Sequence, residues 1–312
     1  MIDSYVFGKV DRISPEAPVP VVTVKRKEKR LGGAANVARN IKALGAIPIL
    51  AGAVGKDLDG DVFMDLMSQE GMSVSGLIRT DRPTTVKTRI IGNKFQLMRV
   101  DEEDDRETTE LEEKIISQHI HQLIKTEKPD AVIFEDYDKG FISRNLIEQV
   151  VEVCKAENII TAADPKSRNF LSYRKVDLFK PNLKEIKEGL TIEINPTDNA
   201  SIAAADQILR EKLNHNLSLI TLSDQGLALT DGSQLIRVPS EEINIADVSG
   251  AGDTVISTAA LCLVAGIDLQ SLAQIANLAG AGVCEKVGVV PVNAAELLDK
   301  ALIALTDSVN NG

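Results

Sequence analysis

The sequence contains no tryptophan, only three cysteines and no long apolar run. Its cysteines are Cys154, Cys262 and Cys284. Because they are far apart and set in apolar surroundings, we expect buried, reduced thiols rather than a disulfide framework. The longest apolar stretch, around residues 261–266, is broken by glycine and then by Asp268, whereas a bilayer span needs roughly 20 apolar residues. With no recognisable secretory leader, these absences predict a cytoplasmic protein without a membrane partner.

Histidines and positive charge are also scarce. His119 and His121 fall on opposite sides of a helical turn and His215 is isolated, so we expect no metal spacing and three solvated side chains. The 35 Lys and Arg against 46 Asp and Glu give a formal charge of −11. Binding to a nucleic-acid backbone needs a basic surface, so this balance argues against nucleic acid as the main partner. A phosphorylated metabolite stays compatible, because local charge in a cleft outweighs distant charge that salt screens.

Short β-branched segments alternate with amphipathic helices in the second half of the chain. The predicted strands cover residues 131–134, 159–162, 176–179 and 217–222, and the predicted helices cover residues 143–156, 182–189 and 200–213. This alternation is typical of an α/β fold with a mostly parallel sheet covered on both faces. Ligands of such sheets bind at the carboxyl ends of the strands, so the residues just after each strand are candidates for function.

Two segments lack helical periodicity. Residues 12–30 are rich in proline and valine, and residues 84–100 predict two strands around a turn at 92–94. We expect the two segments to form one small extra sheet that acts as a lid or as an oligomer contact. The acidic run at residues 101–105 predicts a solvated loop, with metal binding as the alternative.

The motif Gly250-Ala251-Gly252-Asp253 precedes a helix-compatible run. Glycines at a helix N-terminus let backbone N–H groups approach a phosphate, and the helix dipole favours its negative charge. A carboxylate at that helix start could accept the proton of an attacking hydroxyl. A packing turn capped by Asp253 explains the same pattern equally well.

Two other nucleotide-binding motifs are not found. A dinucleotide fingerprint needs Gly or Ala three residues after Gly252, where the sequence has Val255. A Walker A loop needs Ser or Thr after Gly55-Lys56, where the sequence has Asp57. The chain therefore predicts neither a dehydrogenase nor a P-loop NTPase.

Small residues also surround Asn36, in the run Gly32-Gly33-Ala34-Ala35-Asn36. They permit close approach of a ligand at a helix start, and the Asn36 amide offers both a donor and acceptors for sugar hydroxyls. A tight helix–sheet contact capped by Asn36 is the alternative.

Three motifs follow one another along the chain: residues 32–36, the run Asn182-Leu183-Lys184-Glu185, and residues 247–254. In this order and spacing they resemble the PfkB/ribokinase family of carbohydrate kinases. Residues 12–22, 136–140 and 164–166 are similar to the heptose-7-phosphate kinases of the lipopolysaccharide pathway. The resemblance covers essentially the whole chain. It implies a ribokinase-like three-layer α/β/α sandwich, with residues 1–312 as a single kinase domain and β-lid segments at about 12–30 and 84–100.

The resemblance also implies ATP as phosphoryl donor and assigns the catalytic roles. Asp253 is implied as the base that deprotonates the sugar hydroxyl, and the amides of residues 250–252 as an anion hole. Glu185 is implied to hold Mg²⁺ through water, with Asn182 near the phosphates. Without the resemblance, Asn182 and Glu185 are simply a capping box.

Two further groups of positions follow from the resemblance. The nucleotide pocket is implied to contain Thr221, Ser223, Gly226 and Asn277. Asp247 and Ser249 match positions at which some relatives bind a monovalent cation, so K⁺ is a further candidate cofactor.

The sugar is implied to contact Asp3, Gly32, Gly33, Asn36 and Asp136. A 7-phosphate also needs cations, and arginine is suited to bidentate contact with phosphate. The candidates are Lys166, Arg12, Arg89 and Arg99. A surface role is the alternative for each of the three arginines.

One feature departs from the family pattern. Family members begin with a buried strand ending in Gly-Asp before the stretch that matches residues 1–3, so we expect that first strand to be missing here. We expect a kinase without a nucleotidyltransferase domain, and a homodimer through the lid by analogy. The predicted reaction is ATP-dependent phosphorylation of the anomeric hydroxyl of D-glycero-D-manno-heptose 7-phosphate. The alternatives are a kinase for another sugar or sugar phosphate, and a catalytically dead ligand-binding paralogue.

Overall fold

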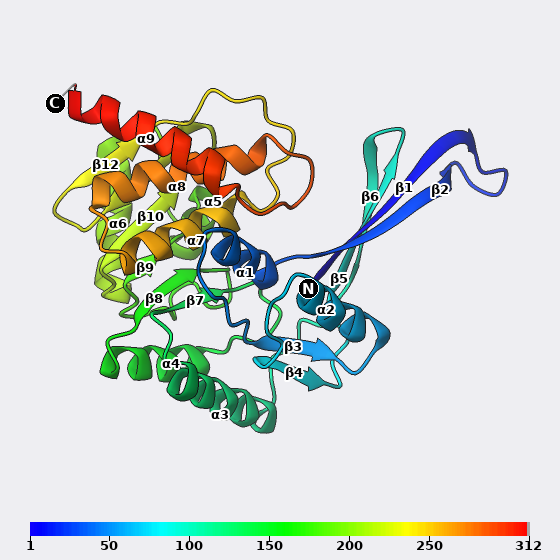
Figure 1. Ribbon diagram of the computed structural model, residues 1–312, viewed down its shortest axis with the longest axis horizontal. Helices are drawn as coiled ribbons and strands as arrows, with labels where there is room; N and C mark the ends of the chain where they lie inside the picture. Colours follow the sequence, from blue (N-terminus) through cyan, green and yellow to red (C-terminus); the bar gives the residue numbers. More distant parts are fainter. Residues whose placement is uncertain (311–312) are drawn as a thin grey trace. The chain divides into compact units, whose positions relative to one another are not determined.

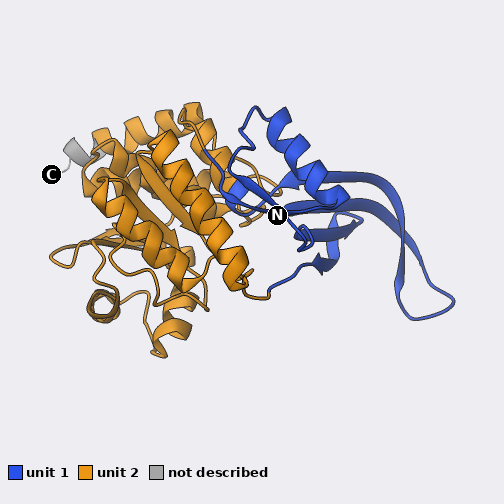
Figure 2. Cartoon of the chain, turned by 90° about the horizontal axis from the view of Figure 1, so that it is seen from below, with its two compact units in different colours: residues 1–35, 49–105 blue, residues 36–48, 106–312 orange. Residues whose placement is uncertain are grey.

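The computed structural model describes the backbone of residues 1–310 and the side chains of residues 1–306. The chain forms two compact units, each described separately below (Figure 2). The smaller unit contains residues 1–35 and 49–105, and the larger unit contains residues 36–48 and 106–312. The helices of the described residues are not long and apolar enough to cross a membrane.

The larger unit is built on a six-stranded sheet with the order β12-β11-β10-β9-β8-β7 (Figure 1). Its strands are β7 (Ala131–Glu135), β8 (Ile160–Asp164), β9 (Leu178–Phe179), β10 (Leu217–Thr221), β11 (Leu227–Thr230) and β12 (Leu235–Val238). Strands β7 to β10 pair in parallel, whereas β11 and β12 are antiparallel. The predicted mostly parallel sheet is therefore confirmed.

Helices cover both faces of this sheet. Helices α7 (Ala251–Val264) and α8 (Leu269–Cys284) lie on one side, with α9 (Ala294–Asn310) packed on α8, and α3 (Glu110–Glu127) and α4 (Arg144–Ala156) lie on the other (Figure 1). The remaining helices of this unit are α5 (Leu183–Leu190), α6 (Asn199–Leu213) and most of α1 (Ala34–Ala43). Adjacent residues on one strand, such as Leu178 and Phe179, are both fully buried, as expected for a sheet in the middle of three layers.

The smaller unit carries a four-stranded sheet with the order β2-β1-β5-β6. Its strands are β1 (Ile2–Ile13), β2 (Pro20–Leu31), β5 (Val86–Gly92) and β6 (Phe95–Glu102). Strand β1 is antiparallel to β2 and parallel to β5, so the two segments that lack helical periodicity pair within one sheet. The unit also contains β3 (Gly52–Gly55), β4 (Leu77–Thr80) and α2 (Leu58–Gln69). The first strand starts ten residues earlier than residue 12, where the extended segment was predicted to begin.

The acidic run differs from its prediction. Asp101 belongs to β6, where Lys87 lies opposite it in the register of β5. The Lys87 ammonium is 3.0 Å from carboxylate oxygens of both Asp101 and Glu103. The prediction of a solvated loop is wrong for Asp101 and Glu102, which belong to β6, and agrees with residues 103–105, which follow the strand and are mostly exposed.

The prediction for His215 is also wrong. Its side chain is buried, Nε2 is hydrogen-bonded to Ser218, and burial lowers its pKa to about 4. His119 and His121 are half-buried on α3 rather than solvated. The prediction for the cysteines is confirmed, since all three are buried free thiols.

Candidate active site

Charged side chains collect at the carboxyl ends of three neighbouring parallel strands. Glu135 ends β7, Asp164 ends β8, and Lys180 directly follows β9. Glu135 and Asp164 are register partners, so their side chains leave the sheet on the same face. The Lys180 ammonium lies 2.8 Å from Asp164 Oδ2, and both side chains are almost completely buried. The edge where ligands of parallel sheets bind therefore contains a buried ion pair.

A second lysine extends this ion pair towards α5. Lys166 Nζ lies 3.2 Å from Asp164 Oδ1 and 2.6 Å from Glu185 Oε1. Burial by itself would lower the pKa of both lysines. The negative charges of Asp164, Glu185 and Glu135 outweigh this effect, so both pKa values are raised. Lys166 and Lys180 are therefore positively charged at any physiological pH.

The N-terminus of α7 faces the same group of charges. Gly250 has φ = 84° at the N-cap, and a Cβ atom there would lie 2.9 Å from Asn36 Nδ2. A Cβ atom on Gly252 would lie 3.5 Å from Lys180 Nζ and 3.6 Å from Asp164 Oδ2. The first turn of a helix has N–H groups without intrahelical acceptors, so backbone donors and a lysine ammonium meet here. This arrangement suits an anionic phosphoryl group.

Asp253 lies in that first turn and is buried. Its Oδ2 accepts a 2.8 Å hydrogen bond from Asn36 Nδ2, and its Oδ1 accepts a 3.2 Å bond from the Tyr137 hydroxyl. Burial raises the pKa of Asp253 to about 6, a rise that Asp164 increases and the two hydrogen bonds limit. A carboxylate with this pKa is ionised at neutral pH and is still basic enough to accept a proton.

Two buried polar atoms beside Asp253 have no hydrogen-bond partner within the described residues. They are Glu135 Oε2 and Asn36 Oδ1. Burial, together with the charges of Asp164 and Asp253, raises the pKa of Glu135 well above its usual range, which favours its protonated form. A neutral carboxyl and an amide oxygen are suited to a ligand hydroxyl, which can both donate and accept.

Asp136 has no such open oxygen. Its Oδ1 accepts from the Asp138 backbone N–H at 2.8 Å, and its Oδ2 accepts from the Tyr173 hydroxyl at 2.7 Å and from Asn169 Nδ2 at 3.1 Å. Asp136 therefore fixes the loop after β7, and the neighbouring Glu135 has the open oxygen next to Asp253.

Asn182 and Glu185 form the capping box of α5. Asn182 Oδ1 accepts from the Glu185 backbone N–H and Glu185 Oε2 accepts from the Asn182 backbone N–H, both at 2.8 Å. Glu185 Oε1 is bonded to Lys166. The capping interpretation is thus correct, and the same carboxylate also belongs to the charged cluster.

The expected nucleotide-pocket residues lie around the end of β10. Thr221 ends that strand, Ser223 opens a single 3₁₀ turn, and Gly226 follows it with φ = 81°. A Cβ atom at Gly226 would lie 2.1 Å from the Val238 carbonyl oxygen, so this turn requires glycine. On α8, Asn277 Nδ2 donates to the Pro239 carbonyl at 2.9 Å and positions the chain after β12.

Asp247 connects two loops near α7. Its Oδ1 accepts from the Ser249 backbone N–H at 2.9 Å, and its Oδ2 accepts from the Gly288 backbone N–H at 3.0 Å. Both oxygens therefore help to hold the turn that leads into Gly250.

The remaining sugar-site candidates belong to the smaller unit. Asp3 is buried in β1 and forms an ion pair with Arg89 of β5. A Cβ atom on Gly32 would lie 2.0 Å from Asp3 Oδ2, and Gly33 has φ = 60°. Arg99 Nε and Nη2 donate to the two carboxylate oxygens of Asp101 at 2.8 and 2.9 Å. Arg12 is exposed near the end of β1.

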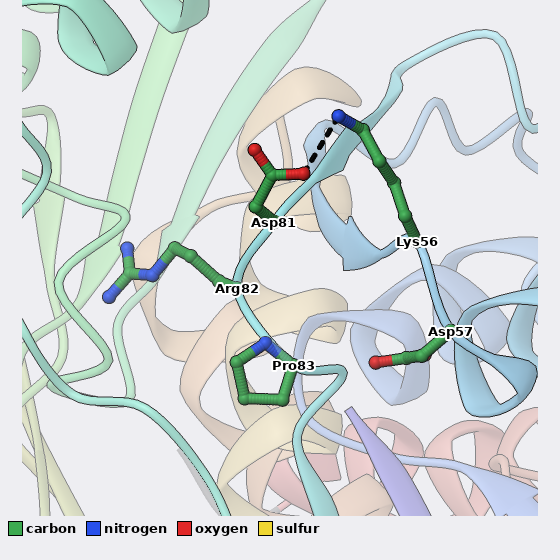
Figure 3. Close-up of a pocket in the computed structure, with 5 residues that line it drawn as sticks. All are labelled: Lys56, Asp57, Asp81, Arg82 and Pro83. Atoms are coloured by element: carbon green, nitrogen blue, oxygen red, sulfur yellow. Dashed lines mark hydrogen bonds and ion pairs between the residues drawn. The ribbon is translucent and has the colours of Figure 1, made fainter.

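The smaller unit also has an open polar pocket (Figure 3). Its lining residues are Lys56, Asp57, Asp81, Arg82 and Pro83. Lys56 and Asp81 form an ion pair of 2.8 Å across its rim. Asp57 caps α2 and also accepts from the Thr84 backbone N–H at 2.8 Å. The Gly55-Lys56-Asp57 run is therefore a helix-capping turn.

Comparisons with known proteins identify the family of the chain. The pfkB family carbohydrate kinase model matches residues 1–295. The chain is 40% identical to the bifunctional protein HldE of Wolinella succinogenes over 92% of this chain and 60% of that protein. It is 37% identical to the bifunctional protein HldE of Methylobacillus flagellatus over 95% of this chain and 60% of that protein. The chain thus spans 60% of the length of these relatives.

Solved structures show the same fold. Phosphofructokinase-2 from Escherichia coli in complex with potassium matches with a TM-score of 0.80 and 17% identity, over 97% of this chain and 95% of that chain. Arabidopsis thaliana ribokinase complexed with ribose and ATP matches with a TM-score of 0.72 and 17% identity, over 95% of each chain. The family match and the fold together define a sugar kinase with a ribokinase-like α/β fold. The chain belongs to the pfkB family of carbohydrate kinases.

Four residues of the cluster were not among the predicted site residues. They are Glu135, Tyr137, Asp164 and Lys180. The sequence did contain a signal for these four residues, because each lies at or just after the carboxyl end of a strand, where ligands of parallel sheets bind.

The raised pKa of Asp253 predicts a pH-dependent effect of Asp253→Asn on stability. The folded carboxyl binds its proton more tightly than the unfolded one, so wild-type stability falls as pH rises from about 4 to about 6. The Asp253→Asn variant has no carboxyl group to ionise at this position, so it does not lose this stability as pH rises. We expect it to gain about 2 to 3 kcal/mol at pH 8 and about half of that at pH 5. Urea unfolding at both pH values measures the difference.

The exposed Asp65→Asn is the matched control, and we expect it to change stability little at either pH. Equal gains for Asp253→Asn at pH 5 and pH 8 would contradict the assignment of a raised pKa.

Proposed function

We propose that the protein transfers the γ-phosphoryl group of ATP to the anomeric hydroxyl of D-glycero-D-manno-heptose 7-phosphate, giving the 1,7-bisphosphate used for ADP-heptose and lipopolysaccharide precursors. The observation that carries the proposal is Asp253, buried in the first turn of α7 with a pKa of about 6. The heptose assignment rests on the stretches at residues 12–22 and 136–140 and on the identity to HldE proteins.

In the proposed reaction, Asp253 accepts the proton of the sugar hydroxyl while that oxygen attacks the γ-phosphorus. The new O–P bond forms, the bond to the ADP oxygen breaks, and the proton ends on Asp253. Asn36 and Tyr137 hold the carboxylate in place through its two oxygens. The amides of Gly250 and Gly252 and the Lys180 ammonium stabilise the negative charge of the transferring group, whereas the Ala251 N–H donates to the Val248 carbonyl at 3.3 Å.

Mg²⁺ fits the oxygen donors at the cluster. Glu185 is a carboxylate at its edge, and Mg²⁺ commonly keeps several waters while it contacts one or two carboxylates and the substrate phosphates. Its chemistry would be to neutralise phosphate charge. Glu185 would hold it through water, with Asn182 beside it. Monovalent cation binding by Asp247 and Ser249 stays a prediction.

We also propose that the four-stranded sheet of the smaller unit is a homodimer contact. The support is its exposed apolar side chains, which are Val24, Phe95, Leu97, Met98 and Val100. Light scattering should give a molar mass of twice the chain, and a monomer at micromolar concentration would refute this proposal.

Asp253→Asn tests the reaction. Loss of the base should lower kcat with heptose 7-phosphate by about 10²- to 10⁴-fold, because a positioned base contributes that much. A coupled ADP-release assay across a panel of sugars and sugar phosphates measures it. Asp65→Asn, the same substitution at an exposed aspartate of α2, is the matched control and should leave activity unchanged. Unchanged phosphorylation by Asp253→Asn would refute the mechanism.

The pKa of Asp253 sets the expected pH profile. The kcat/KM should rise with pH to a plateau above about 6, because only the ionised carboxylate accepts a proton. Tyr137→Phe removes a hydrogen bond that lowers this pKa, so the rising limb should move to higher pH. A limb that stays in place in Tyr137→Phe would contradict the role of that hydrogen bond.

A further inference from the structure

The Lys166 ammonium connects the end of β8 to the first turn of α5. It donates to Asp164 Oδ1 at 3.2 Å, to the Pro165 carbonyl oxygen at 3.2 Å and to Glu185 Oε1 at 2.6 Å. A lysine ammonium has three N–H donors, so these three contacts use all of them. All four residues belong to the larger unit. Lys166 is therefore fully engaged within one compact part of the molecule.

Glu185 is engaged at both of its carboxylate oxygens. Oε2 accepts from the Asn182 backbone N–H at 2.8 Å within the capping box, and Oε1 accepts from Lys166. The first contact is needed for α5 to begin at this point, because it satisfies a backbone donor of the helix terminus. The second contact satisfies no backbone group. The Lys166 ammonium is therefore the partner of Glu185 that another cation can replace.

The two lysines of the cluster differ in their access to a ligand. Lys180 is 3% exposed and is fixed by Asp164, whereas 31% of the Lys166 side chain is exposed. A divalent cation beside Glu185 would lie close to the Lys166 ammonium, and like charges in a partly buried place repel each other strongly. The phosphates of a nucleotide would offset this repulsion. Metal alone is thus disfavoured at Glu185, and metal together with phosphates is favoured.

We propose that Lys166 is an exchangeable counter-ion of Glu185, which opposes binding of Mg²⁺ alone and gives one N–H donor to a nucleotide phosphate when metal and nucleotide bind together. This inference rests on the proposed function. Asp164 and the Pro165 carbonyl continue to hold the ammonium during the exchange, so Lys166 gives up only one of its three contacts. Lys166 thereby couples the binding of the metal to the binding of the nucleotide.

The test is Lys166→Gln, with Mn²⁺ as the probe because carboxylate ligands suit Mn²⁺ as they suit Mg²⁺. We expect the nucleotide-free variant to bind Mn²⁺ about 10- to 100-fold more tightly than the wild type, because a charge adjacent to a carboxylate changes its cation affinity by such factors. The Mn²⁺ affinity of the ADP complex should change little, since the phosphates already offset the lysine charge. Electron paramagnetic resonance of free Mn²⁺ measures both affinities.

Three further variants serve as controls. Lys187→Gln removes the same charge from an exposed lysine of α5, which pairs with Glu193 at 3.0 Å, and should leave the Mn²⁺ affinity unchanged. Lys166→Arg keeps the charge and should keep the wild-type affinity. The double variant Lys166→Gln/Glu185→Gln should lose the gain, which assigns the bound Mn²⁺ to Glu185. Thermal unfolding checks that every variant is folded.

Unchanged or weaker Mn²⁺ binding by nucleotide-free Lys166→Gln would overturn the inference. An equal gain in Lys187→Gln, or a gain that persists without the Glu185 carboxylate, would also overturn it. The binding measurement is independent of turnover, so the two proposals can fail separately. A wild type that phosphorylates heptose 7-phosphate while Lys166→Gln shows no gain would refute only the counter-ion role. The expected gain in a protein that phosphorylates no sugar would support that role and refute the proposed reaction.

Discussion

The buried ion pair between Lys180 and Asp164 is the constraint on which the site depends. Neither charge can be withdrawn from water without the other, and removing one partner would leave an uncompensated charge in the interior. The pair lies at the carboxyl edge of the sheet, directly beneath Gly252. A Cβ atom on Gly252 would be in van der Waals contact with Lys180 Nζ and Asp164 Oδ2, so the first turn of α7 lies directly against the ion pair. The charged side chains at the sheet edge and the backbone N–H donors of α7 therefore face the same place, beside Gly252.

This electrostatic setting explains why Asp253 differs from an ordinary surface aspartate. Its carboxylate is desolvated and lies near Asp164, which together raise its pKa, while Asn36 and Tyr137 keep it from remaining protonated at neutral pH. Asn40, one turn after Asn36 on α1, accepts from the Val292 backbone N–H at 2.8 Å and from the Thr254 hydroxyl at 3.3 Å. Helix α1 is thereby tied to α7 through side chains that are buried and hydrogen-bonded, so the geometry of the base is held by two helices.

Local patterns in the sequence were sufficient for most of the larger unit. The strands around residues 131–134, 159–162 and 217–222 agree with β7, β8 and β10 to within one or two residues, because β-branched runs and helix caps are short-range signals. Strand β1 was located less well. Its length depends on pairing with β2 on one side and β5 on the other, and residues 86–92 are far away in the sequence.

The sequence by itself determined the motifs, their order and the position of Asp253 at a helix start, since these follow from residue type and spacing. The tertiary structure decided which neighbours surround it. Alternation along β7 directs Glu135 towards Asp253 and leaves Asp136 bonded to Tyr173, although the two residues are adjacent. Lys180 and Tyr137 follow the carboxyl ends of β9 and β7, and pairing of the strands brings both to the same edge of the sheet. A buried charge or hydroxyl obtains its role from partners that are distant in the sequence, and only folding brings those partners within hydrogen-bond distance.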